Sequence, residues 1–172
     1  MRKLSQRHLK LTKLSKRSKP DADKFVAEMR RTVKSDPKVI EKFKEYGVSL
    51  DEIDDVHIEF CKLDVSAKTK DEKIYLNEKM LKDDSDVEDP TNYLVHELMH
   101  YLQQSTGNVD DKKQDKEYLD RPTEEEAFKA QIDYKNREES DGSAEEYVEG
   151  LLDHHDVKDK DEVKYREKLL GK

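Results

Sequence analysis

A five-residue segment near the middle of the chain carries the residue types needed for metal chemistry. His96, Glu97 and His100 follow the pattern His-Glu-x-x-His. On a helix, residues four positions apart lie on the same face, so both imidazoles can reach one ion. A glutamate beside the first histidine can accept a proton from water and pass it to a leaving amine. The spacing therefore predicts a metal-binding helix with Glu97 as the catalytic base.

Zinc is the ion that this set of donors favours, with one Zn²⁺ per chain. Zinc binds neutral histidine nitrogens at about 2.0–2.1 Å, and its catalytic sites combine three protein ligands with one open position for water. His96 and His100 supply two ligands, so a third must come from elsewhere in the chain. The acidic segment 124–126 is the candidate source.

Three neighbouring glutamates compete for the role of third ligand. Glu124 shares its helical face with Gln131, which favours Glu124. Thr123 and Glu126 have the spacing of a capping box, which would hold the Glu126 carboxylate at the start of its own helix. We therefore rank Glu124 first, Glu126 second and Glu125 third. An acidic first helical turn is also common without any metal, because it opposes the helix dipole.

Together these segments resemble the gluzincin group of zincin metallopeptidases, particularly the small bacterial and phage types. In that group a glutamate on a later helix completes the site, often within Glu-x-x-Ala, and Glu124 with Ala127 matches this pattern. The resemblance covers roughly residues 56–135. It implies hydrolysis of a protein or peptide substrate by a zinc-bound water that Glu97 activates.

The sequence departs from related patterns at two places. Many gluzincins have an aspartate four residues after the third ligand to orient a histidine, and Phe128 stands at that position. Asp133, Asp120 or a backbone carbonyl would then have to orient the histidines. Residue 103 is glutamine and residue 106 is threonine, so the third histidine of the metzincin pattern is absent.

Further site roles rest on the resemblance alone. His154 or His155, after a short helix, is a candidate to stabilise the oxyanion, although a histidine that faces the dipole at an exposed helix end is the commoner reason for such a pair. Arg121 and Tyr134 are alternatives for the same role. The strand expected at 73–77 could hold an extended peptide substrate by backbone hydrogen bonds, or could simply cover the core.

The sequence predicts that these residues are positioned by a compact, zincin-like α+β domain with a small antiparallel sheet. Alternating apolar residues indicate strands near 56–65 and 73–77, with the charged segment 66–72 as a hairpin loop. Helical spacing indicates an active-site helix at about 90–105 and a third-ligand helix at about 123–138. Helices are expected at both ends, at 21–46 with a break at Pro37, and at 144–153 and 160–170.

Composition and charge divide the chain into two parts. Only 33% of the residues are hydrophobic and 44% are charged, so the core is small and a bound metal would stabilise it. Residues 1–19 carry eight basic side chains and no acidic one, which leaves a charge of −16 on residues 20–172. We predict a basic flexible arm at 1–19, able to contact nucleic acid, an anionic surface or an acidic partner, before a single metallopeptidase-like domain at 20–172. The acidic domain argues against duplex nucleic acid as the main partner.

Cys61 is the only cysteine, so the chain forms no internal disulfide, which favours a reducing, cytoplasmic compartment. No apolar run approaches the 18 residues of a membrane span. A phage origin would also allow association with the virion.

Two other interpretations remain open. One is a catalytically weak or inactive zincin scaffold that binds a partner through its basic arm. The other is a chance motif in an α+β domain without a metal.

Overall fold

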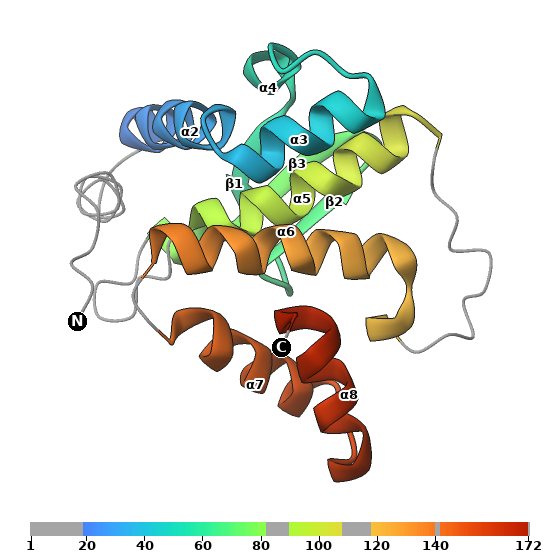
Figure 1. Ribbon diagram of the computed structural model, residues 1–172. Coiled ribbons are helices and arrows are strands. Elements are labelled where there is room, and N and C mark those ends of the chain that lie inside the picture. The colour runs from blue at the N-terminus through green and yellow to red at the C-terminus, as the bar shows by residue number, and fades with distance from the viewer. Residues whose placement is uncertain (1–18, 82–89, 108–117, 140–141, 172) are drawn as a thin grey trace.

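The computed structural model describes residues 19–81, 90–107, 118–139 and 142–171. The basic arm predicted at 1–19 therefore lies, up to residue 18, outside the described residues. Figure 1 shows the elements in chain order: α2 (Lys19–Lys34), α3 (Pro37–Tyr46), α4 (Glu52–Asp55), β1 (Ile58–Cys61), β2 (Ala67–Lys70), β3 (Lys73–Asn77), the 3-10 turn η1 (Glu78–Leu81), α5 (Pro90–Ser105), the 3-10 turn η2 (Tyr118–Asp120), α6 (Pro122–Glu138), α7 (Ser143–His154) and α8 (Asp159–Leu170).

The α+β class, the active-site helix and the third-ligand helix are confirmed, and the two helices predicted around Pro37 are present as α2 and α3. Pro37 is the first residue of α3, where its missing N–H costs no helical hydrogen bond. At the other end of α3, Gly47 adopts the left-handed conformation with φ of 71° and terminates the helix. Along the described parts of the chain, no helix combines the length and apolar character needed to cross a bilayer.

The sheet differs from the antiparallel pair predicted from the sequence. It has three strands in the order β1-β3-β2, with β1 parallel and β2 antiparallel to the central strand β3. The segment predicted as a hairpin loop contains β2. A turn at Asp71 and Glu72, both at positive φ, reverses the chain directly into β3. β2 reads Ala-Lys-Thr-Lys, and because its lysines are exposed it lacks the hydrophobic alternation that identifies a strand.

The main core lies between the sheet and the helices α2, α3, α5 and α6. Phe25 of α2, Ile74 and Leu76 of β3, and Leu98 of α5 are fully buried there, and Ala127 joins them from α6. β3 reaches this core with alternate side chains, as a sheet with one covered face does. The sheet therefore fixes α5 from one side, while α6 covers α5 from another (Figure 1).

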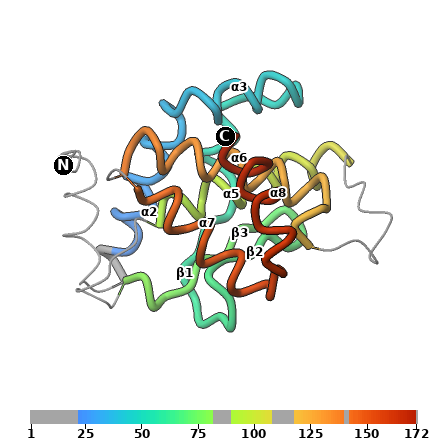
Figure 2. The backbone as a smooth tube through the Cα atoms, turned by 60° about the horizontal axis from the view of Figure 1, so that its bottom comes forward, coloured from blue at the N-terminus to red at the C-terminus, as the bar shows by residue number. Residues whose placement is uncertain are grey.

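A second, smaller core holds the C-terminal helices α7 and α8 against the opposite side of α6. Figure 2 views the molecule with these two helices toward the reader. Phe128 and Ile132 of α6 meet Val148 and Leu152 of α7 there, together with Leu169 of α8. α6 is thus shared by both cores.

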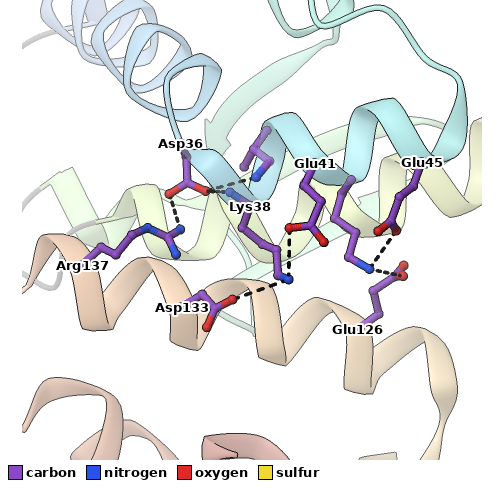
Figure 3. A network of polar contacts seen from close by, with 9 residues as sticks. Asp36, Lys38, Glu41, Glu45, Glu126, Asp133 and Arg137 are labelled. Atoms are coloured by element: carbon purple, nitrogen blue, oxygen red, sulfur yellow. Dashed lines mark hydrogen bonds and ion pairs between the residues drawn. The ribbon is translucent and has the colours of Figure 1, made fainter.

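Helix α3 is tied to α6 by polar contacts that Figure 3 shows from close by. The Asp36 carboxylate caps α3, accepting hydrogen bonds from the backbone N–H groups of Lys38 and Val39 at 2.9 and 3.1 Å. Arg137 of α6 donates to the same carboxylate at 2.6 Å. One buried aspartate therefore both begins α3 and fixes its distance from α6.

We expect Asp36→Ala to lower the free energy of unfolding by about 2 kcal/mol, because the helix cap and the bond from Arg137 are lost together. Asp36→Asn retains a capping oxygen and should cost about half as much. Denaturant unfolding followed by circular dichroism measures both. Equal losses in the two variants would assign the effect to the ion pair with Arg137 instead of the cap.

Candidate metal centre

Helices α5 and α6 bring the three predicted ligand residues together. His96 and His100 lie one turn apart on α5, and Glu124 faces them from the first turn of α6. Their ligand atoms all lie within 4.8 Å of one another. His96 Nε2 is 3.2 Å from His100 Nε2 and 3.7 Å from Glu124 Oε1, and His100 Nε2 contacts that same oxygen. Two imidazoles and one carboxylate therefore converge on one point.

The start of α6 decides which glutamate faces the histidines. The helix begins at Pro122, one residue before the expected start, so Thr123 lies inside the first turn and the predicted capping box with Glu126 does not form. Proline favours the first helical position, because its φ is already helical there. Glu126 faces away from the histidines, toward α3, and accepts hydrogen bonds from Tyr46 and Lys42.

Glu124 and His100 stabilise each other's charged form, although burial opposes the charge on both. Burial alone would raise the pKa of the Glu124 carboxyl, but hydrogen bonds and charge from His100 and His96 lower it well below its usual range. Burial alone would lower the pKa of His100, but Glu124 raises it to about 9. Glu124 Oε2 is buried, and none of the residues that the structure describes forms a hydrogen bond with it. A carboxylate oxygen without a partner beside two imidazole nitrogens fits a divalent cation.

Gln131 of α6 orients the first histidine. Its amide oxygen lies 3.0 Å from His96 Nδ1 and also accepts from the Tyr147 hydroxyl at 3.1 Å, while its amide nitrogen donates to Asn92 Oδ1 at 2.6 Å. An amide oxygen only accepts, so His96 Nδ1 carries the hydrogen and Nε2 keeps its lone pair for a metal. This is the usual task of a group behind a metal-bound histidine.

Gln103 orients the second histidine, with its amide oxygen 2.9 Å from His100 Nδ1. The aspartates predicted for this task lie elsewhere: Asp133 pairs with Lys38, and Asp120 accepts a hydrogen bond from Tyr165. The sequence did contain a signal for this contact, because Gln103 follows His100 by three residues and so shares a helical face with it.

The catalytic base predicted from the sequence lies beside this group and is held by the sheet. Glu97 is 6% exposed, and its Oε2 accepts a hydrogen bond of 2.6 Å from the hydroxyl of Thr69 on β2. The same hydroxyl lies 3.1 Å from the Glu97 carbonyl oxygen. Sequence reasoning missed Thr69 because it treated this segment as a loop.

The strand predicted to hold a substrate cannot do so by its edge. β3 is the central strand and is hydrogen-bonded to β1 on one side and β2 on the other. Within the described parts of the chain, β1 and β2 are the two edge strands of the sheet. Of these two, β2 is the strand that carries Thr69, the contact to Glu97.

Tyr118 of η2 is close enough to the site for its carboxylates to act on the Tyr118 hydroxyl, and sequence reasoning missed this residue. Burial raises the pKa of its hydroxyl, and the negative charges of Glu124 and Glu97 raise it further. His155 stacks on the Tyr118 ring at 4.8 Å between centroids, and the Arg121 guanidinium lies 5.4 Å from the ring centroid.

The residues expected near the oxyanion thus fall into two groups. His155 and Arg121 contact the Tyr118 ring and so lie around the site. His154 is exposed, and Tyr134 is 2% exposed within the main core. Among the described residues, the group with metal-ligand geometry consists of His96, His100 and Glu124.

Comparison with known proteins gives one family. The sequence model of Peptidase_M91, a metallopeptidase family described as effector protein, matches residues 11–167. The match includes all the residues of the site described above. No curated protein and no solved structure matches the chain.

Glu124 faces the histidines and Glu126 faces α3, and zinc titration can test which of the two is the ligand. We expect Glu124→Ala to weaken zinc affinity by at least about 100-fold, because it removes a direct ligand. Glu126→Ala should cost no more than about 10-fold, because that side chain faces α3 and does not contact the histidines. Competition with a chromophoric chelator measures both variants. Equal losses, or the reverse order, would overturn the assignment of Glu124.

Proposed function

The chain belongs to the Peptidase_M91 family of effector metallopeptidases, and we propose that it is a zinc-dependent peptidase with Glu97 as its catalytic base. The observation that carries the proposal is the buried convergence of His96, His100 and Glu124, with Glu97 on the same helix. A protein or peptide is the proposed substrate.

Zinc suits these donors better than calcium or magnesium. Two imidazoles and one carboxylate are typical of catalytic zinc sites, whereas calcium and magnesium prefer oxygen ligands. When bound there, zinc would polarise a peptide carbonyl and lower the pKa of a water molecule. His96, His100 and Glu124 would hold the ion, and Gln131 and Gln103 fix the two imidazole rings.

Glu97 moves the protons of the reaction. It accepts one from the attacking water and delivers it to the amine nitrogen as the C–N bond breaks. Thr69 holds Oε2 of this carboxylate, and Oε1 takes no part in that bond. Because Thr69 is on β2, the sheet fixes the direction in which the base points.

Tyr118 is the proposed donor to the oxyanion. Its buried phenol hydroxyl is close enough to Glu124 and Glu97 for both carboxylates to raise its pKa, which brings it near the group that would hold the metal. The stacked His155 ring and the Arg121 guanidinium hold the aromatic ring from outside. A fixed hydroxyl of this kind stabilises negative charge as it develops.

We expect Glu97→Gln to keep about one zinc per chain and to lose hydrolysis by about 10²–10⁴-fold, the usual contribution of a general base. Metal analysis and cleavage of a peptide library measure the two properties. His96→Ala is the control, and it should lose zinc and activity together. Full activity in Glu97→Gln would remove Glu97 as the base. A wild-type chain that binds zinc and cleaves no peptide would favour the inactive scaffold.

We expect Tyr118→Phe to lower kcat by about 100-fold, the loss typical of one oxyanion donor, with zinc affinity changed little. Tyr101→Phe is the matched control, because its hydroxyl donates to Glu52 at 2.7 Å on α4. Steady-state kinetics on a cleaved peptide separates kcat from KM. Equal kcat losses in both variants, or loss of zinc in Tyr118→Phe, would contradict the assigned role.

A further inference from the structure

We infer that Glu126 is a positioning residue for His100: acting through Gln103, it holds the imidazole in the tautomer that leaves Nε2 to the metal. The inference rests on the proposed zinc site and adds a residue that does not touch the ion. Glu126 lies on α6 only two residues after Glu124, but it points toward α3 (Figure 3).

The Glu126 carboxylate is fixed from three directions. Its Oε1 accepts a hydrogen bond of 2.6 Å from the Tyr46 hydroxyl and one of 3.0 Å from Gln103 Nε2. Its Oε2 accepts from Lys42 Nζ at 3.2 Å. Lys42 Nζ can only donate, so Glu126 Oε2 must accept from it, while Oε1 receives the Tyr46 hydroxyl and the Gln103 amide.

This acceptor decides which way the Gln103 amide points. Gln103 is 2% exposed, and its Nε2 donates both to Glu126 Oε1 and to the carbonyl oxygen of Thr123 at 3.1 Å. A flipped amide would place its oxygen against these two acceptor oxygens, so both hydrogen bonds would be lost and lone pairs would face each other in a buried position. The amide oxygen is therefore directed at His100.

The amide oxygen in turn fixes the histidine tautomer. Gln103 Oε1 lies 2.9 Å from His100 Nδ1, and because this oxygen only accepts, Nδ1 must carry the hydrogen. With Nδ1 holding its hydrogen, Nε2 is the nitrogen that would give its lone pair to a metal, and it lies at the point that His96 and Glu124 also face. A flipped amide would offer an N–H group to Nδ1 and favour the tautomer that cannot bind metal through Nε2.

His96 has its own orienting group, which does not involve Glu126. Gln131 donates to Asn92 and accepts from Tyr147, and its oxygen faces His96 Nδ1. The two histidines are therefore oriented by two separate amides. Loss of Glu126 should disturb His100 alone.

Zinc affinity in a double-mutant cycle tests the inference. Glu126→Ala should weaken zinc binding by about 3–10-fold, and Gln103→Met by about 10–100-fold, the range for groups behind a ligand. In the Gln103→Met background, Glu126→Ala should change the affinity by less than about twofold, because its route to His100 is already broken. Glu126→Gln, which keeps an acceptor for Gln103, should retain near wild-type affinity.

The matched control is Glu125→Ala, because the neighbouring carboxylate pairs with Lys129 at 2.9 Å and with Lys168 at 3.4 Å, away from Gln103. It should leave zinc affinity unchanged. The visible absorption of the Co²⁺-loaded chain is a second readout. It should shift in Gln103→Met and Glu126→Ala, and match wild type in Glu125→Ala and Glu126→Gln.

Three results would overturn the inference. One is equal zinc affinity in Glu126→Ala and Glu125→Ala. Another is a Glu126→Ala effect that persists undiminished in the Gln103→Met background. In both cases the proposed zinc site would stand if His96→Ala still abolished binding. A wild-type chain that binds neither Zn²⁺ nor Co²⁺ would instead remove the proposed function, and the inference with it.

Discussion

The structure depends on burying three candidate metal ligands between two helices of a chain that is only 33% hydrophobic. His96 and Glu124 are 7% and 6% exposed, and His100 is partly buried beside them. Polar groups removed from water cost free energy unless each finds a partner. Gln131 and Gln103 supply partners to the two imidazole Nδ1 atoms, which leaves both Nε2 atoms directed at the carboxylate. The hydrogen bonds that orient the two imidazoles therefore also offset the free-energy cost of burying them.

The elements around α5 and α6 supply the partners that these buried polar side chains need. β2 contributes Thr69, which holds Glu97, and α7 contributes Tyr147, which donates to Gln131. η2 contributes Tyr118, and α3 contributes Tyr46, which holds Glu126. A site built on α5 and α6 alone would leave each of these contacts unmade. Because α6 belongs to both hydrophobic cores, the packing of α7 and α8 bears on the same helix that presents Glu124.

Local patterns in the sequence predicted the site better than they predicted the sheet. The spacing of His96 and His100 and the face shared by Glu124 and Gln131 depend on helical periodicity alone, so both could be derived from residue order. β2 escaped prediction because lysine and threonine at an exposed edge carry no hydrophobic alternation. The parallel pairing of β1 with β3 depends on contacts distant in sequence. Tyr118 could not be placed for the same reason, since η2 reaches the site only in the folded chain.

The acidic run 124–126 shows how one turn of helix can serve three neighbours. Successive residues of an α-helix are rotated by about 100°, so three consecutive glutamates face three directions. Glu124 faces the histidines of α5, Glu125 pairs with Lys168 of α8, and Glu126 accepts from Lys42 of α3. Their shared acidity had made them look like alternatives for one role. The rotation of the helix instead lets only Glu124 face the histidines, and it directs the other two to the helices that hold α6 in position.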